Sequence, residues 1–118
     1  FIAYPEEGSE ECEEFSGCDY KGQFAAFDYA QTEQWVMDHN IVAVHGDDFG
    51  TYERKTLRIR QDGLEIDAVV YDLCSDSDCD GCCTRNASET GVLSDMETYA
   101  ANRFRSEGGV VEWACLDC

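Results

Sequence analysis

Basic residues are scarce in this chain of 118 residues, where 8 lysines and arginines stand against 26 aspartates and glutamates for a formal net charge of −18. Such a chain repels nucleic-acid backbones and anionic membrane surfaces, so we expect neither as a partner. Cationic partners, metal ions and neutral polymers are all compatible with this charge. An acidic surface that only keeps a monomer soluble is the simplest alternative.

Long apolar runs are missing too, and none approaches the roughly 20 residues that a helix needs to cross a bilayer. The first residues, from Phe1 to Pro5, lack the basic region of a signal peptide and are typical of a processed mature end. The chain contains one proline and no internal repeat. Its hydrophobic content of 43% is ordinary for a globular core, and its length fits one domain over residues 1–118.

Signatures of several enzyme classes are also lacking. We find no glycine-rich phosphate loop, no serine nucleophile elbow and no cysteine–histidine dyad. The two histidines, His39 and His45, are six residues apart and match no paired metal-ligand spacing. Hydrolases of the triad type are therefore unsupported.

Cysteine, by contrast, is abundant and even in number, which favours disulfides and an oxidising compartment. The eight cysteines are Cys12, Cys18, Cys74, Cys79, Cys82, Cys83, Cys115 and Cys118. Their pairing stays open, because eight cysteines allow 105 connectivities. Zinc bound by the two Cys-x2-Cys pairs is the alternative, but it leaves the other four cysteines unexplained. We expect a secreted protein with an N-linked glycan at Asn86, since Asn86-Ala87-Ser88 is a sequon.

The segment from Tyr71 to Cys83 holds four of the cysteines and four aspartates. Asp76, Asp78 and Asp80, followed by a glycine, reproduce the first half of an EF-hand calcium loop. Ala87 occupies the position of the closing bidentate glutamate. We therefore interpret the segment first as a disulfide staple and expect no cofactor, with weak calcium binding as the open alternative.

Strand patterns dominate the rest of the chain. Two alternating runs around Asp62-Gly63 give the strongest hairpin signal. A capping box of Ser94 and Glu97 predicts the one convincing helix, which Gly108-Gly109 would end. Further strands are expected over residues 22–29, 40–45 and 110–116, a helical turn over 32–37, and an acidic, cysteine-tied segment over 1–21. The prediction is an all-β domain with one or two short helices.

Several of these segments, in this order, resemble the double-psi β-barrel family of expansins, barwin-like proteins and small barrel endoglucanases. The matching segments are residues 22–28, 41–44, 55–59, 68–74, 95–96 and 109–113, within a region of similarity of roughly 22–118. Tyr52-Glu53-Arg54 and Leu93-Ser94 depart from motifs that the family often carries. The resemblance implies a six-stranded, disulfide-bonded double-psi β-barrel.

The resemblance also implies a groove in which Asp28 and Asp95 lie together. Carboxylates at similar places in the barrel endoglucanases act as general base and general acid of an inverting hydrolysis. Asp95 at the start of a helix would equally be a structural residue, stabilised by the helix dipole. We therefore expect a module that binds extracellular or cell-wall polysaccharide rather than an enzyme.

Polysaccharide binding requires aromatic faces for stacking on sugar rings, with polar groups beside them. The candidate rings are Tyr29, Trp35, Tyr52 and Tyr71, while strand alternation assigns Trp113 to the core. One alternative is an inverting endo-β-glucanase that uses the two aspartates. Another is an acidic interaction protein, either a protease inhibitor or a calcium- or mineral-binding matrix protein.

Overall fold

A computed structural model of the chain describes residues 2–3, 22–78, 80–88, 90–105 and 108–118. Most of the predicted acidic segment, with Cys12 and Cys18, lies outside the described residues, and so does Cys79. The described elements are β1 (Ile2–Ala3), α2 (Glu33–Asp38), β2 (Ile41–His45), α3 (Gly46–Tyr52), β3 (Thr56–Gln61), β4 (Leu64–Cys74), the 3₁₀ helix η1 (Asp76–Asp78), α4 (Cys82–Ala87), β5 (Ser94–Met96), α5 (Thr98–Phe104) and β6 (Glu112–Cys115).

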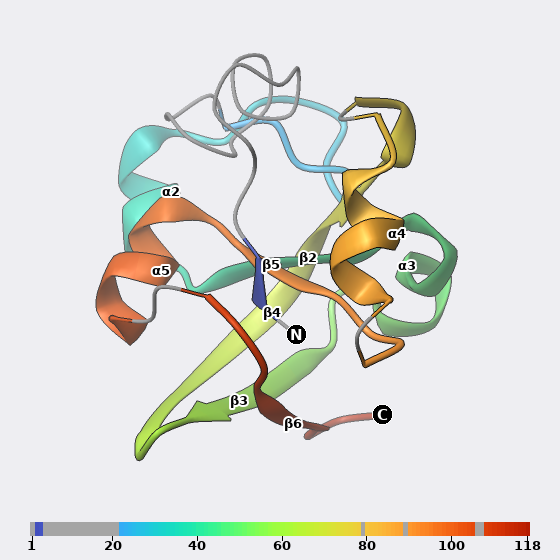
Figure 1. Ribbon diagram of the computed structural model, residues 1–118. Helices are drawn as coiled ribbons and strands as arrows, with labels where there is room; N and C mark the ends of the chain where they lie inside the picture. Colours follow the sequence, from blue (N-terminus) through green and yellow to red (C-terminus); the bar gives the residue numbers. More distant parts are fainter. Residues whose placement is uncertain (1, 4–21, 79, 89, 106–107) are drawn as a thin grey trace.

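The strands form one mixed sheet in the order β1-β5-β2-β4-β3-β6 (Figure 1). The pairs β1–β5 and β2–β4 are parallel, and the other pairs are antiparallel. Within the described residues β1 and β6 stand at opposite ends of this order, so the sheet is open. The predicted all-β, six-stranded double-psi barrel is therefore wrong, and the domain is a mixed α/β fold.

Two helices that the strand patterns concealed explain part of this error. Helix α3 follows β2 directly, because the imidazole Nδ1 of His45 accepts a hydrogen bond from the backbone N–H of Asp47 at 3.1 Å and caps the helix. Helix α4 starts at the cysteine pair Cys82-Cys83, in a segment whose cysteines and aspartates predict a loop. The two helices span only 7 and 6 residues, too few to show a strong helical period in the sequence.

The predicted hairpin is confirmed. Strands β3 and β4 pair from Thr56↔Val69 to Gln61↔Leu64. The turn residues Asp62 and Gly63 have φ angles of 50° and 84°, the left-handed values that a two-residue turn matching the strand twist requires. The predicted helical turn over 32–37 is also confirmed as α2.

The capping-box prediction is wrong. Ser94 lies in the buried strand β5, where it pairs with Val44, so tertiary pairing overrides the local cap signal. Glu97 is itself the cap of α5: its Oε2 accepts a hydrogen bond from the Tyr99 N–H at 2.7 Å. The helix ends at Arg105, which adopts the left-handed conformation.

The predicted first strand over residues 22–29 is likewise wrong. This segment makes turns and bends. Two of its N–H groups form single hydrogen bonds to β4 instead of a strand ladder. Ala26 donates to the Tyr71 carbonyl at 2.9 Å, and Ala25 donates to Asp72 Oδ1 at 3.0 Å.

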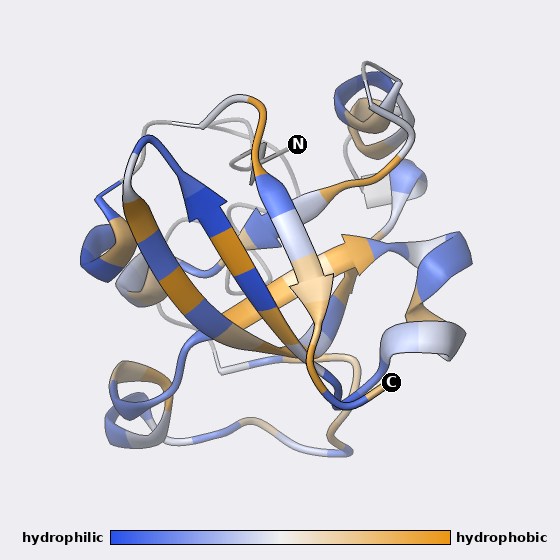
Figure 2. Ribbon diagram, turned by 90° about the horizontal axis from the view of Figure 1, so that it is seen from below, coloured by the Kyte–Doolittle hydropathy of each residue, from blue (hydrophilic) through white to orange (hydrophobic). Residues whose placement is uncertain are grey.

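The sheet packs hydrophobic residues on both faces. Alternation along β3 and β4 is visible in Figure 2, where hydrophilic and hydrophobic residues follow one another. One face carries the main core: Val42, Val44, Phe49, Leu57, Ile59, Ile66, Ala68, Val70, Met96, Ala100 and Phe104. The alternate residues of β2 face the other way, where one cluster forms around Phe24, Val36 and Ile41 and another around Cys74, Cys82, Cys83 and Leu93. Each fully buried aliphatic side chain contributes roughly 1.5–3 kcal/mol.

Candidate functional site

A row of three residues crosses the middle of the sheet on the face opposite Val42 and Val44. Ala43 of β2 is in register with Asp72 of β4 and with Asp95 of β5. Residues in register on neighbouring strands project from the same face of a sheet. We call Asp72, Ala43 and Asp95 the acidic row.

Strand spacing sets the geometry of the acidic row. Neighbouring strands lie roughly 4.8 Å apart, so the backbones of Asp72 and Asp95 are roughly 10 Å apart across Ala43. The methyl group of Ala43 places no bulky side chain between the two aspartates. Ala43 and Asp95 are each 7% exposed, whereas Asp72 is half-buried.

A register shift between Val42 and Ala43 leaves Tyr71 as the extra residue of β4. Bulges of this kind re-aim side chains and are common beside functional sites. Here the bulge brings Tyr71 and Asp72 together next to Ala43. The ring of Tyr71 therefore directly precedes the carboxylate of Asp72, which is one end of the acidic row.

Tyr71 belongs to a group of rings that we call the aromatic cluster: Phe24, Phe27, Trp35 and Tyr71. The Phe27 centroid lies 5.1 Å from that of Tyr71 and 5.3 Å from that of Trp35, and Trp35 and Tyr71 are 5.3 Å apart. Such edge-on and tilted pairs are the favourable arrangements of aromatic rings. The cluster therefore packs against itself while its members from Phe27 onwards stay partly exposed.

Two further side chains cover ring faces of the cluster. His39 stacks on Trp35 with centroids 4.1 Å apart and an interplanar angle of 18°. The Arg54 guanidinium carbon lies 4.9 Å from the Phe27 centroid, and its Nη2 donates to the Ala26 carbonyl at 2.7 Å. One face of the Trp35 ring and one face of the Phe27 ring are therefore covered by side chains of this chain.

The predicted sugar-binding rings separate into two groups. Trp35 and Tyr71 come together in the aromatic cluster, and Tyr29, two residues after Phe27, is 75% exposed. Tyr52 lies elsewhere, edge-on to Trp113 at 5.5 Å beside the main core. The structure thus gathers part of the predicted set and leaves Tyr52 out.

The two predicted catalytic aspartates occupy different environments. Asp28 is exposed on the loop before α2, and Asp95 is buried in β5 instead of opening a helix. It is Asp72, not Asp28, that shares a row with Asp95. The sequence signal for Asp72 was its position at the end of a long strand, just before Cys74. Catalytic roles for Asp28 and Asp95 stay a prediction.

Glu97 lies two residues after Asp95, between β5 and α5, and is only 5% exposed. Burial raises the pKa of its carboxyl, although the backbone N–H groups of Tyr99, Ala100 and Thr98 act in the opposite direction. Its Oε2 caps α5, whereas Oε1 is buried and has no hydrogen-bond partner within the described structure. A second buried acid therefore stands close to the row in sequence.

A polar cluster holds α4 against β2. Asp76 accepts hydrogen bonds from both the backbone N–H of Thr84, at 2.9 Å, and its hydroxyl group. These bonds, the hydroxyl first, hold the pKa of Asp76 below its usual range, with a smaller effect from His45. His45 Nε2 lies 3.1 Å from Thr84 Oγ1 and 3.4 Å from Asp76 Oδ2.

This cluster is unsuited to nucleophilic catalysis. Because Nδ1 of His45 accepts the Asp47 N–H, the neutral imidazole carries its proton on Nε2. An Nε2–H group donates toward Thr84 and Asp76 and cannot remove the proton of the threonine hydroxyl. The arrangement is therefore a structural clasp and not a catalytic dyad.

The described cysteines form disulfides. Cys74 pairs with Cys83 and Cys115 pairs with Cys118, while Cys82 is also disulfide-bonded. The sulfur atoms of Cys74, Cys82 and Cys83 lie within 4.8 Å of one another, but disulfide sulfurs are not zinc thiolates. The zinc alternative is therefore wrong for these residues, and the disulfide prediction is confirmed for them.

The predicted calcium ligands are only partly suited to that role. Both oxygens of Asp76 already accept hydrogen bonds from Thr84. Asp80 is exposed with a φ of 54°, and its carbonyl accepts a hydrogen bond from Arg85 at 3.1 Å. The side chain of Asp78 lies outside the described part. Calcium binding here stays a prediction.

The sequon in which glycosylation is predicted begins on α4. Asn86 is half-buried in the last turn of this helix, and the Ser88 hydroxyl donates to the Arg85 carbonyl at 2.7 Å.

Among the described residues, no helix combines the length and apolar character needed to cross a membrane.

No protein-family model matches the chain, and a search of curated proteins finds no match either. The fold and the site therefore define the class of protein. It is a disulfide-bonded mixed α/β domain with an acidic row at the centre of its sheet and an aromatic cluster beside it.

Proposed function

We propose that this chain is a non-catalytic module that binds an extracellular polysaccharide at Asp72, the half-buried end of the acidic row, and at the partly exposed rings of the aromatic cluster. The observation that carries the proposal is that Asp72, the residue that follows Tyr71, is in register with Ala43 of the acidic row. Carboxylates beside aromatic rings are the groups that proteins use against sugar hydroxyls and sugar faces. This is the binding function that the resemblance to expansins predicts, on an open sheet instead of a barrel.

The exposed ring of Tyr29 supports the same proposal. It is the most exposed of the large hydrophobic side chains described, and it lies on the loop whose Phe27 belongs to the aromatic cluster. A tyrosine at this position offers a free face for stacking. A neutral polymer is the favoured ligand because the net charge of −18 repels anionic glycans.

We further propose that the protein is secreted and glycosylated at Asn86. Disulfides persist in oxidising compartments, and the described part of the chain contains two of them with both partners placed. Mass spectrometry of protein from a eukaryotic secretory host tests this. A glycan mass that disappears in Asn86→Gln supports the proposal, and an unmodified Asn86 contradicts it.

Sedimentation with insoluble cellulose and with chitin tests the binding function. The wild-type chain should be depleted from solution by at least one of them without release of reducing sugar. Tyr29→Ala and Asp72→Asn should each reduce the bound fraction, whereas Asp47→Asn, a charge-matched change on α3, should not. Equal binding by all variants would contradict the site, and no binding would contradict the function.

A second candidate function is inverting glycoside hydrolysis, and the spacing of the acidic row favours it. Inverting enzymes place their two carboxyl groups roughly 6.5–9.5 Å apart, and strands two positions apart in a sheet allow such a separation. Release of reducing sugar from soluble β-glucan, lost in Asp95→Asn, would establish this activity. Retained release in Asp95→Asn but not in Asp72→Asn would exclude Asp95 as the acid.

A further inference from the structure

The outer edge of β6 is a second surface with features of a binding site. Strand β6 pairs with β3 on one side and ends the strand order of the described sheet on the other. Unpaired strand edges present N–H and C=O groups to any extended chain. Natural edges are often protected by proline or by charged side chains, lysine above all; Glu-Trp-Ala-Cys contains no proline and no lysine, and its one charge is that of Glu112.

The pairing register defines which backbone groups face outward. Leu116 donates to the Thr56 carbonyl at 2.9 Å, so its N–H points toward β3. Antiparallel pairing alternates, so the backbone groups of Ala114 and Glu112 also face β3, whereas those of Trp113 and Cys115 face away. Two successive outward positions are enough to start a ladder with an added strand.

Apolar side chains flank both ends of this edge. Of the four large hydrophobic residues that are exposed among those described, Val110 at 53% and Leu116 at 47% lie on either side of β6. Single exposed apolar residues are normal, but this pair brackets one strand whose outer edge ends the strand order of the described sheet.

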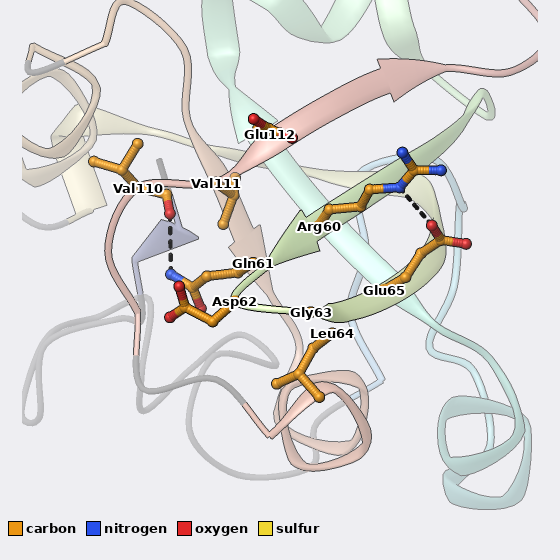
Figure 3. A pocket seen from close by; sticks show the side chains of 9 residues that line it. All are labelled: Arg60, Gln61, Asp62, Gly63, Leu64, Glu65, Val110, Val111 and Glu112. Atoms are coloured by element: carbon orange, nitrogen blue, oxygen red, sulfur yellow. Dashed lines mark hydrogen bonds and ion pairs between the residues drawn. The ribbon is translucent and has the colours of Figure 1, made fainter.

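A pocket of about 420 Å³ opens at the start of β6, between this strand and the β3–β4 turn (Figure 3). Leu64, Val110 and Val111 give it apolar walls. The Gln61 side chain donates to the carbonyls of Gly108, at 3.0 Å, and Val110, at 3.1 Å. These bonds hold the 108–110 backbone against the hairpin, so the pocket is already formed.

The rim of this pocket is acidic. Asp62, Glu65 and Glu112 line it together with one cation, Arg60, which is 2.5 Å from Glu65 (Figure 3). Glu65 also lies 3.4 Å from Arg58 Nε, so the excess negative charge of the rim comes from Asp62 and Glu112. A lysine or arginine suits such a pocket, because its methylene stem packs on apolar walls while its charge reaches the rim.

We propose that β6 binds an extended, basic segment of a partner protein by β-strand addition, with one basic side chain in the pocket. Main-chain hydrogen bonds to Trp113 and Cys115 supply affinity, and the pocket supplies specificity. The proposal is independent of the polysaccharide site. The charge of −18 favours a basic partner over a second copy of this chain.

The test uses two blocked synthetic peptides of equal length and charge, one alternating lysine with valine and the other lysine with proline. Calorimetry should detect binding of the lysine–valine peptide alone, because proline cannot form the ladder. Hydrogen exchange should slow at the amides of Trp113 and Cys115 in the complex. The double variant Asp62→Asn/Glu112→Gln should bind roughly 3- to 10-fold more weakly.

Matched controls separate a site from general attraction. Asp47→Asn/Asp48→Asn removes the same charge from α3 and should leave affinity unchanged. Equal binding of both peptides, an equal loss in the control variant, or protection elsewhere would each overturn the proposal. Concentration-dependent dimers of the free chain, with protection at the same two amides, would assign the edge to a second copy and also overturn it.

Discussion

Acidic residues are buried near the centre of the sheet, whereas at its hairpin end they are exposed and paired with arginine. At the centre, around β5, Asp95 and Glu97 are buried, and burial raises the pKa of Glu97. At the hairpin end, Asp67 lies opposite Arg58 with an N–O distance of 2.9 Å, and this hydrogen bond lowers the pKa of Asp67. Buried acids cost stability, whereas exposed paired acids cost little. The two buried acids at the centre are therefore consistent with a binding role.

The disulfides show the same contrast. Cys74 and Cys83 are buried at 2% and 0% exposure and fasten α4 to the end of β4. Cys115 and Cys118 are three residues apart at the end of β6, and Cys118 is exposed. A buried bridge that closes a longer loop contributes more stability.

The largest expected effect comes from removing the buried disulfide between Cys74 and Cys83. Cys74→Ser/Cys83→Ser should lower the free energy of unfolding by about 2–4 kcal/mol, because the unfolded chain gains freedom and two hydroxyls are buried. Denaturant melts measure it. The matched variant Cys115→Ser/Cys118→Ser should lose less, and an equal or larger loss there would reverse the comparison.

Glu97→Gln should have the next largest effect. A carboxyl whose folded pKa is raised binds its proton more tightly when folded, so stability falls as pH rises from the unfolded pKa through the folded one. The glutamine side chain keeps the cap but carries no charge, so this variant should be more stable than wild type at pH 7, on the order of 1 kcal/mol. The gain should vanish at a pH below the unfolded pKa of a glutamate, which is about 4.3. A gain that is independent of pH would refute the buried charge as its cause.

Arg58→Gln should have a smaller effect of opposite sign. Because the folded pKa of Asp67 is lowered, its contribution to stability is present above its unfolded pKa and is lost as pH falls through the folded value. The variant should therefore be slightly less stable than wild type at pH 7, and this difference should shrink in high salt. Thermal melts at two salt concentrations check this, and a salt-independent loss would indicate packing of the arginine stem instead.

The smallest expected effect is that of calcium. Since the Asp76 oxygens are occupied by Thr84, millimolar calcium should leave the melting temperature unchanged. A calcium-dependent increase that is abolished in Asp80→Asn would contradict this and restore the cation-loop interpretation.

Local signals predicted the elements that depend on local chemistry. The Asp62-Gly63 hairpin, the helical turn that forms α2 and the terminal strand β6 all follow from neighbouring residues. Strand β5 could not be predicted from its neighbours, because Ser94 carries a cap signal and becomes a strand only through pairing with β2 and β1.

The candidate site could be predicted only in part for the same reason. The sequence points to Asp95, Trp35 and Tyr71, but it pairs Asp95 with Asp28. That Asp72 shares a row with Asp95 depends on strand order and on a bulge in β4, which residue patterns do not encode. Closure of the sheet is likewise a non-local property, and the prediction of a barrel is wrong.

The most direct test compares two aspartates that have different roles in the proposed site. Affinity for a polysaccharide that retains the wild-type chain should fall in Asp72→Asn, which keeps an acceptor for the Ala25 N–H. It should stay unchanged in Asp28→Asn, which alters an exposed loop residue outside the acidic row. Loss of affinity in Asp28→Asn with full affinity in Asp72→Asn would contradict the acidic row as the binding site.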